Sequence, residues 1–87
     1  MIEVELEINA FGTKRYYIKG TGIYHREDGA AVEYANGDKS WYQYGKYHRL
    51  DGPAVECTNG YREFWINNKH IENVRSIEEA IIKSLLE

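Results

Sequence analysis

The sequence predicts a mainly β (α+β) fold, an antiparallel β meander of tandem hairpin repeats of 23 residues with one C-terminal α-helix. Three observations predict it: a tandem repeat, a strict alternation of apolar and acidic residues near the N-terminus, and a helical apolar pattern near the C-terminus. We expect a single domain over residues 1–87. It divides into an N-terminal hairpin (1–20), two tandem hairpin repeats (21–71) and a helix (76–86).

The N-terminal segment predicts a half-buried strand. Apolar and acidic residues alternate with a period of two from Ile2 to Ile8. A turn around residues 9–12 returns the chain onto residues 14–19. Segregation of charged and apolar groups then sets the register. The expected pairs are Leu6 with Tyr16, Val4 with Ile18, Glu7 with Arg15 and Glu3 with Lys19.

The repeat organises the middle of the chain. Residues 22–44 and 45–67 align without a gap, and 11 of 23 positions are identical. Residues 11–17 resemble the second half of a unit, and residues 68–70 resemble the start of a third. Such repeats are supersecondary units that stack on their neighbours, with atypical ends as caps.

Turn residues predict how each unit folds. Asn36-Gly37 and Asn59-Gly60 indicate two-residue type I′ hairpin loops, because both central residues of that turn need positive φ. The expected pairs are Val32 with Trp41, Tyr34 with Lys39, Val55 with Phe64 and Cys57 with Arg62, which also sets Glu56 against Glu63. Gly45-Lys46 predicts a further turn that pairs Tyr44 with Tyr47 and Tyr42 with Arg49, and Asn68-Lys69 predicts another. The remaining turns fall at Asp28-Gly29 and Asp51-Gly52-Pro53.

The C-terminal segment predicts a helix. Ser76 and Glu79 form a capping box. Ile77, Ala80, Ile81 and Leu85 share one helical face, with Ile82 and Leu86 beside it. We expect the helix to cover one face or the open end of the sheet, because an uncovered sheet edge invites aggregation.

Composition excludes several function classes. A chain of 87 residues is too short for a large catalytic barrel, and one Cys permits no internal disulfide and no Cys-rich zinc site. A net charge of −3 argues against direct nucleic-acid binding. We find no signal peptide or membrane span, and the lone Cys57 fits a reducing cytoplasm, that of the host cell if the protein is viral. No cofactor is expected.

The segment His-Arg-x-Asp occurs twice, at residues 25–28 and 48–51. One interpretation is an acid–base or metal site built from His25, Asp28, His48 and Asp51, which would make the protein a hydrolase. The other is a structural turn in which Arg pairs with Asp and His packs beside Tyr. A catalytic pair rarely recurs in tandem, whereas a structural turn must, so the sequence favours no catalytic residue, no metal and no enzyme. Cys57 is interpreted as a small buried hydrophobic residue.

The repeat resembles a viral family. Its Tyr-His-Arg-x-Asp-Gly-x-Ala-Val-Glu segment, followed by Asn-Gly and an aromatic pair, is similar to the His-Arg-x-Asp-Gly-Pro-Ala repeat of phage and giant-virus proteins, a variant of the MORN hairpin repeat. The first unit departs from it, with Ala30 where the second has Pro53. The matching residues are His25, Arg26, Asp28, Gly29 and Ala31, then His48, Arg49, Asp51, Gly52, Pro53 and Ala54. The resemblance covers about residues 22–70 and implies a β-hairpin array of viral source. Small viral accessory proteins commonly bind and block a host factor.

Surplus aromatic residues predict a binding face. The chain has 8 Tyr, 2 Trp and 2 Phe, more than so small a core can absorb. Alternation puts Trp41 and Tyr42 on opposite faces, and likewise Phe64 and Trp65, and Tyr, Trp and Arg are enriched at binding hot spots. The expected function is a non-enzymatic protein-binding module, a phage-encoded inhibitor of a host protein complex such as an antiviral defence system. The expected partner-binding residues are Tyr24, Tyr42, Tyr44, Tyr47, Arg49 and Trp65.

Two further functions stay open from the sequence. Arg26, Arg49 and aromatic stacking could make the protein a nucleotide-binding sponge. The chain could also be a structural unit that associates with itself through its edge strands. Alternating Tyr simply suits exposed strands as well, so composition alone does not decide among these functions.

Overall fold

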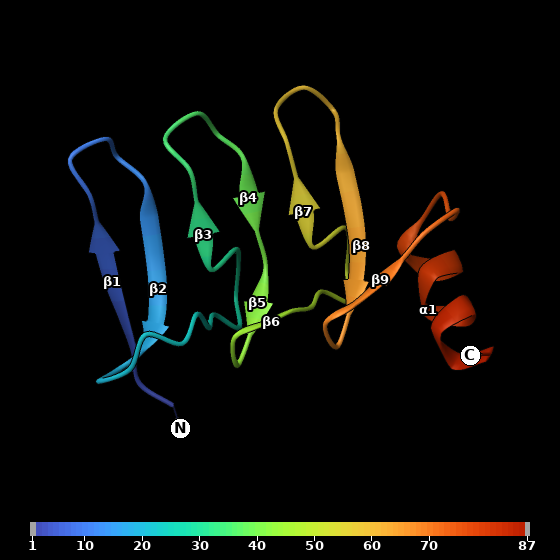
Figure 1. Cartoon of the computed structure of the whole chain (residues 1–87), viewed down its shortest axis with the longest axis horizontal. Coiled ribbons are helices and arrows are strands. Elements are labelled where there is room, and N and C mark those ends of the chain that lie inside the picture. The colour runs from blue at the N-terminus through green and yellow to red at the C-terminus, as the bar shows by residue number, and fades with distance from the viewer. Residues whose placement is uncertain (1, 87) are drawn as a thin grey trace.

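Hairpins follow one another side by side along the molecule, from the N-terminus to a helix at the opposite end (Figure 1). The computed structural model describes residues 2–86. Seven strands form one antiparallel sheet in the order β1-β2-β3-β4-β7-β8-β9, and β5 and β6 form a second, two-stranded sheet. The elements are β1 (Val4–Ile8), β2 (Lys14–Ile18), β3 (Val32–Glu33), β4 (Lys39–Ser40), β5 (Tyr42–Gln43), β6 (Lys46–Tyr47), β7 (Val55–Glu56), β8 (Arg62–Ile66), β9 (Lys69–Ile71) and α1 (Ile77–Leu86). The predicted β meander with a C-terminal helix is confirmed.

The N-terminal hairpin has the predicted register. Val4 pairs with Ile18, Leu6 with Tyr16 and Glu7 with Arg15. Glu3 and Lys19 meet as an ion pair at 3.2 Å. The alternation of apolar and acidic residues was sufficient to predict this register, because a shift by one residue would move every apolar side chain to the other face.

The loop at Asn36-Gly37 is longer than predicted. Val32 pairs with Ser40 and Glu33 with Lys39, so the expected pairs of Val32 with Trp41 and of Tyr34 with Lys39 are wrong. The loop has three residues, closed by a bond from Tyr34 N–H to the Asp38 carbonyl, and only Gly37 has positive φ, at 98°. This is a type I turn followed by a left-handed glycine, an alternative that Asn-Gly also permits. The Asn36 side chain favours it by accepting the Asp38 N–H at 3.0 Å.

The second unit repeats this correction. Val55 pairs with Glu63 and Glu56 with Arg62, so neither Val55 with Phe64 nor Cys57 with Arg62 forms a pair. Cys57 N–H instead bonds the Tyr61 carbonyl, and Gly60 has φ of 93°. Because Glu56 meets Arg62, the expected opposition of Glu56 and Glu63 is also wrong, and opposite charges meet in its place.

Type I′ turns lie at two other positions. Tyr42 pairs with Tyr47 around a turn at Tyr44 and Gly45, whose φ values are 51° and 79°, so Gly45-Lys46 is not the turn and Tyr44 does not pair with Tyr47. Tyr42 likewise does not pair with Arg49. The next turn lies at Asn67 and Asn68, with φ of 50° and 66°, in place of Asn68-Lys69. Positive φ at both central residues is the requirement of this turn.

The helix packs against one face of the sheet at its C-terminal end, over β8 and β9. Ser76 Oγ accepts the Glu79 N–H at 3.2 Å, and Glu79 accepts the N–H of Arg75, one residue before the position that a capping box predicts. Ala80 packs with Phe64 of β8 and Ile71 of β9, and Ile66, Val74 and Ile77 surround them. Leu85 lines a groove together with Ile81 and Ile66, as a shared helical face predicts, but its side chain is 78% exposed.

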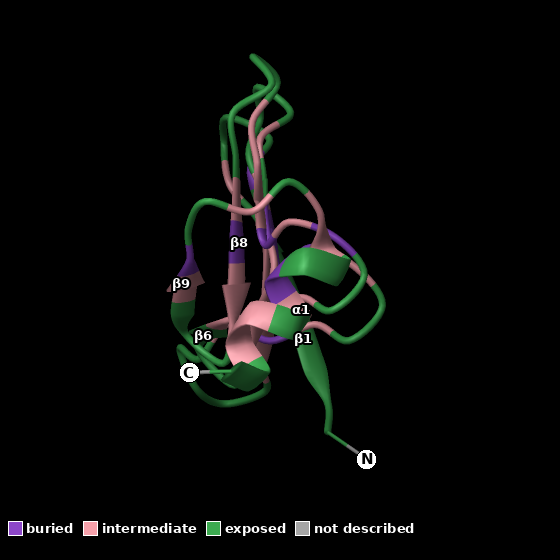
Figure 2. Ribbon diagram, turned by 90° about the vertical axis from the view of Figure 1, so that its right-hand side faces the viewer, coloured by how far each residue is buried: buried purple, intermediate pink, exposed green. Residues whose placement is uncertain are grey.

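The molecule is a thin slab of 39 × 32 × 16 Å. Figure 2 shows it edge-on, with buried segments at mid-height and exposed hairpin tips. Small side chains dominate the buried positions and let neighbouring hairpins approach closely. The buried residues include Ala30, Ala31, Val32, Ala54, Phe64, Ile71, Ala80, Thr13, His25 and Ser40.

Candidate binding surface

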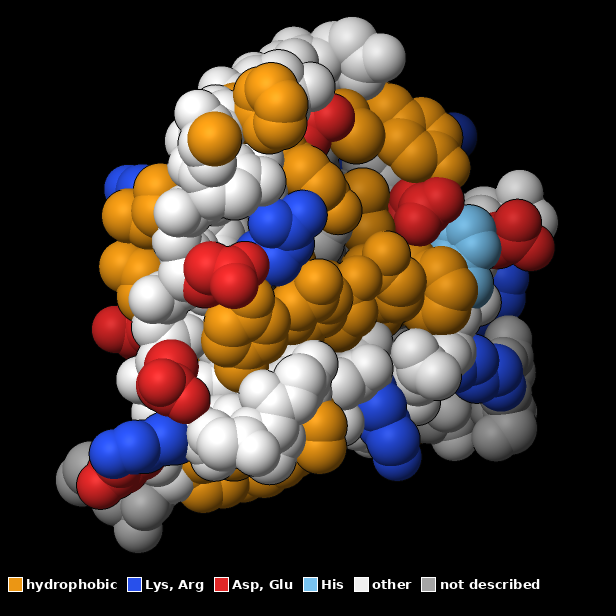
Figure 3. Space-filling view, turned by 60° about the vertical axis from the view of Figure 1, so that its left-hand side comes forward, with side chains coloured by type: hydrophobic (Ala, Val, Ile, Leu, Met, Phe, Trp, Pro, Cys, Tyr) orange, Lys and Arg blue, Asp and Glu red, His pale blue; other side chains and the backbone are white. Residues whose placement is uncertain are grey.

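Six aromatic rings form a continuous row across the hairpins. Their centroids are spaced 5.7 Å (Tyr17 to Tyr24), 5.1 Å (to Tyr42), 4.5 Å (to Tyr47), 4.9 Å (to Trp65) and 4.9 Å (to His70). These spacings are those of favourable aromatic pairs. We call this row the aromatic ladder. Figure 3 shows a continuous band of hydrophobic side chains across one face of the molecule, bordered by acidic and basic groups.

The repeat builds the ladder from two interleaved series. Tyr24, Tyr47 and His70 are spaced 23 residues apart, and Tyr42 and Trp65 have the same spacing. Tyr17 takes the corresponding place in the N-terminal hairpin and forms an isolated bridge with Tyr24. All six side chains are half-buried. Each ring therefore has a packed surface and an accessible one.

Carboxylates border the ladder. Glu63 accepts the indole N–H of Trp65 at 2.9 Å and the hydroxyl of Tyr61, and these bonds lower the pKa of Glu63. A hydrogen bond to Glu7 raises the pKa of Tyr17. Burial, followed by a hydrogen bond with Tyr47, raises the pKa of Tyr42. Tyr17 and Tyr42 are thus neutral and Glu63 is charged near pH 7.

Arg26 and Arg49 occupy the centres of the two equivalent turns. Arg49 Nε donates to Asp51 at 2.7 Å, and its Nη1 donates to the Pro53 carbonyl at 2.9 Å and to Glu56. Its guanidinium lies 3.7 Å from the ring centre of Trp41 in the preceding unit. The first turn repeats this arrangement, which we call the arginine clamp, with Arg26 bonded to Asp28, Ala30 and Glu33 and stacked at 4.0 Å on Tyr16.

The histidines of the two turns hold the type I′ turns. His25 Nδ1 accepts the Tyr44 N–H at 2.9 Å, and His48 Nδ1 accepts the Asn67 N–H at 2.9 Å. His25 is fully buried, and its Nε2 has no hydrogen-bond partner among the described residues. Burial lowers the pKa of His48. The pairing of Arg with Asp and the packing of His25 against Tyr44, at 4.3 Å, are confirmed.

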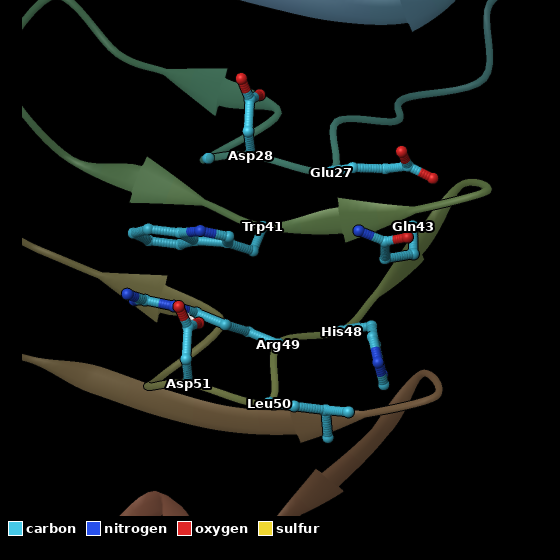
Figure 4. Close-up of a pocket in the computed structure, with 9 residues that line it drawn as sticks. Glu27, Asp28, Trp41, Gln43, His48, Arg49, Leu50 and Asp51 are labelled. Atoms are coloured by element: carbon cyan, nitrogen blue, oxygen red, sulfur yellow. Dashed lines mark hydrogen bonds and ion pairs between the residues drawn. The ribbon is translucent and has the colours of Figure 1, made fainter. Parts of the chain in front are cut away.

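A groove of about 640 Å³ separates the two turns (Figure 4). Trp41, with the Arg49 guanidinium over its ring, and the carboxylates of Glu27, Asp28 and Asp51 line it. Within residues 2–86, no cluster of three or more His, Cys, Asp or Glu side chains is arranged to hold a metal ion. The described region also contains no helix of the length and hydrophobicity needed to cross a membrane.

The predicted partner-binding residues lie in three places. Tyr24, Tyr42, Tyr47 and Trp65 all lie in the ladder. Tyr44 instead packs on His25, and Arg49 stacks on Trp41. Tyr17 and His70 complete the ladder and were not predicted. His70 could have been found from its spacing, because it lies 23 residues after Tyr47. Cys57 is a half-buried free thiol whose pKa is raised, first by desolvation and then by Asp38.

No protein-family model, curated protein or solved structure matches the chain.

Proposed function

We propose that this chain is a non-enzymatic protein-binding module whose partner contacts the aromatic ladder. The observation that carries this proposal is the continuity of six half-buried rings across three hairpins. Rigid Tyr and Trp side chains supply a large contact area at a small cost in side-chain entropy. Repeat arrays commonly present such an extended surface to a partner.

Three carboxylates beside ladder rings support a basic partner surface. Glu7 bonds Tyr17 and Glu63 bonds Trp65. Glu72 Oε1 lies 3.9 Å from His70 Nδ1. A surface that presents Lys or Arg among apolar side chains complements these groups. Its cations could also lie over the Tyr and Trp faces.

The arginine clamps argue against the nucleotide-sponge alternative. Each guanidinium already holds two carboxylates and one carbonyl oxygen. A phosphate would have to displace a carboxylate from Arg26 or Arg49 before it could bind there. The clamps therefore support a structural role for both His-Arg-x-Asp segments.

The viral resemblance adds a finer proposal. We propose that the partner is a host protein complex, that binding inhibits it, and that this takes place in the cytoplasm. The free Cys57 thiol is compatible with that reducing compartment.

Affinity capture with matched variants tests the proposed surface. Tagged wild-type protein would be incubated with an extract of the cells in which it acts, and the captured protein would be identified, purified and titrated. We expect Trp65→Ala and Tyr47→Ala to weaken binding by about tenfold or more, as hot-spot residues do. Phe11→Ala, at an exposed hairpin tip, is the matched aromatic control and should bind as the wild type does.

Two outcomes would contradict the proposal. One is undiminished binding by correctly folded Trp65→Ala and Tyr47→Ala proteins. The other is a rise in melting temperature with a nucleotide that is lost in Arg49→Lys, which would favour the sponge.

A further inference from the structure

The outer side of β1 is an open edge of the sheet. β1 is the first strand of the seven-stranded sheet and pairs on one side only, with β2 (Figure 1). All five of its residues are exposed. At the opposite end of the array, α1 packs on β8 and β9. β9 also pairs on one side only, but α1 packs against its face. Within residues 2–86, no helix packs against β1.

Backbone bonding identifies the groups that face outward. The Glu3 carbonyl accepts the Lys19 N–H, and the Asn9 N–H donates to the Thr13 carbonyl, so odd-numbered residues bond to β2. Antiparallel pairing alternates, so the N–H and C=O groups of Val4, Leu6 and Ile8 point away from β2. These groups are available to an added strand. Inside the array, β3 joins β2 and β7 joins β4 through the same kind of pairing.

Side chains on the two sides of β1 specify what such a strand would carry. Glu3, Glu5 and Glu7 form an acidic row on one side. Glu3 is paired with Lys19, Glu5 accepts the Gly20 N–H at 3.0 Å, and Glu7 bonds Tyr17. Val4 and Leu6 lie on the other side and line a groove of about 440 Å³. A complementary strand therefore alternates basic residues, opposite the glutamates, with apolar residues that cover Val4 and Leu6.

A second copy of the chain fits this edge poorly. Only even-numbered residues offer outward backbone groups, so an antiparallel copy must pair even with even and therefore odd with odd. Every such register that pairs at least two of Val4, Leu6 and Ile8 sets glutamates of one β1 directly opposite glutamates of the other. Like charges directly opposite one another destabilise strand pairing.

We propose that the outer edge of β1 is a docking site for an extended strand of a partner protein, in which Lys or Arg alternates with apolar residues. The strand would add to the sheet through the backbone groups of Val4, Leu6 and Ile8. The site borders the aromatic ladder at Glu7, which bonds Tyr17. Its outward backbone groups belong to no ladder residue, so the proposal does not rest on the proposed function.

Peptide binding to β1 variants tests the docking site. The probe is a fluorescently labelled peptide in which lysine and valine alternate, and a peptide of the same composition with lysines and valines in two blocks is its control. Leu6→Pro removes an outward N–H without touching the bonds to β2, and we expect it to weaken binding of the alternating peptide by about tenfold or more. Leu6→Ala keeps that N–H and should weaken binding only about twofold to fivefold. Phe11→Ala should bind as the wild type does.

Charge reversal provides a second test that does not depend on the proline variant. Replacing both Glu5 and Glu7 with Lys should abolish binding of the lysine–valine peptide and confer binding of a peptide in which glutamate and valine alternate. Circular dichroism and cooperative unfolding verify that each variant is folded. Equal binding of the alternating and block peptides, or undiminished binding by folded Leu6→Pro, would overturn the proposal. A wild-type dimer in light scattering that Leu6→Pro dissociates would assign the edge to a second copy instead.

Discussion

Arg49 connects its own turn to the preceding unit. Its bonds to Asp51, Pro53 and Glu56 are local, whereas its stacking on Trp41 crosses from one unit to the next. The local part could be predicted, because Arg and Asp two residues apart in a repeated turn favour an ion pair. The stacking could not, because it depends on how two hairpins lie against each other, which no sequence spacing within a unit encodes.

Gly52→Ala should weaken this clamp. A Cβ at position 52 would lie 2.8 Å from Arg49 Cζ. The guanidinium can move away, but it then loses its hydrogen bonds and its stacking on Trp41, so we expect a loss of about 1–3 kcal/mol in the free energy of unfolding. Urea denaturation measures it. Gly22→Ala, where a Cβ would meet nothing within 4 Å, is the matched control and should be neutral or slightly stabilising. Equal effects of the two substitutions would refute this role of Gly52.

His48 should make stability dependent on pH. Burial lowers its pKa below 6.5, and its neutral Nδ1 accepts the Asn67 N–H. The unfolded chain therefore takes up this proton more readily, so the contribution of His48 is complete above about pH 6.5 and decreases as the pH falls below that value. His48→Asn keeps an acceptor but does not titrate. Urea unfolding at about pH 7.5 and about pH 5 should show a smaller difference for this variant than for the wild type. An unchanged difference would show that His48 is not the titrating group.

Each hairpin was predictable as an element, but its register was not always so. In β1 and β2 the strict alternation of apolar and acidic residues was sufficient. At Asn36-Gly37 and Asn59-Gly60, the same dipeptide permits a two-residue or a three-residue loop, and the two loops differ by one residue in register. Contacts between tips accompany the longer loop: Asp38 accepts the Thr58 N–H at 2.9 Å, and Thr13 accepts the Ala35 N–H at 3.2 Å. These bonds join different units, so local sequence did not reveal them.

The turn glycines should differ in their tolerance of alanine. Gly37 and Gly60 have nearly the same positive φ, and alanine in that conformation costs about 1–2 kcal/mol. A Cβ at Gly37 would also lie 2.8 Å from Thr58 Cγ2, whereas at Gly60 it would meet nothing within 4 Å. We therefore expect Gly37→Ala to destabilise more than Gly60→Ala, as measured by thermal unfolding. If the double variant Gly37→Ala/Thr58→Ser regains the stability lost in Gly37→Ala, the difference arises from the contact between hairpin tips. An equal loss of stability in Gly37→Ala and Gly60→Ala would exclude a contribution from that contact.

The candidate surface was partly predictable for the same reason as the hairpins. Four of the six ladder residues were predicted, because surplus aromatic residues at repeated positions indicated a shared face. Tyr44 and Arg49 were grouped with them but lie elsewhere, since their places depend on the type I′ turn and on the clamp. The burial of individual helix residues could not be predicted. Its residues predicted an apolar face, but the pattern did not show that Ala80 is buried against Phe64 and Ile71 while Leu85 is 78% exposed.

Along the array, stability should be local. Each hairpin contacts mainly its neighbours, so damage at one end should spread only a short distance. Ala80→Asp places a charge against Phe64 and Ile71, and we expect hydrogen exchange to show protection of residues 62–71 reduced by about a hundredfold or more. Residues 4–18 should change by less than about tenfold. Ile82→Asp, on the exposed side of α1, is the matched control and should alter neither segment. Equal loss of protection throughout the chain would show that it unfolds as one unit.

The 16 Å thickness of the slab has a consequence for how such a protein can change length. A compact globule buries a larger fraction of its surface as it grows. Here one more 23-residue unit would add two strands to the sheet, about 10 Å of width, and leave the depth unchanged. It would also add two rings to the ladder and one clamp. The number of hairpin units therefore sets the length of the aromatic surface. Duplication of the coding segment for one unit is enough to lengthen it.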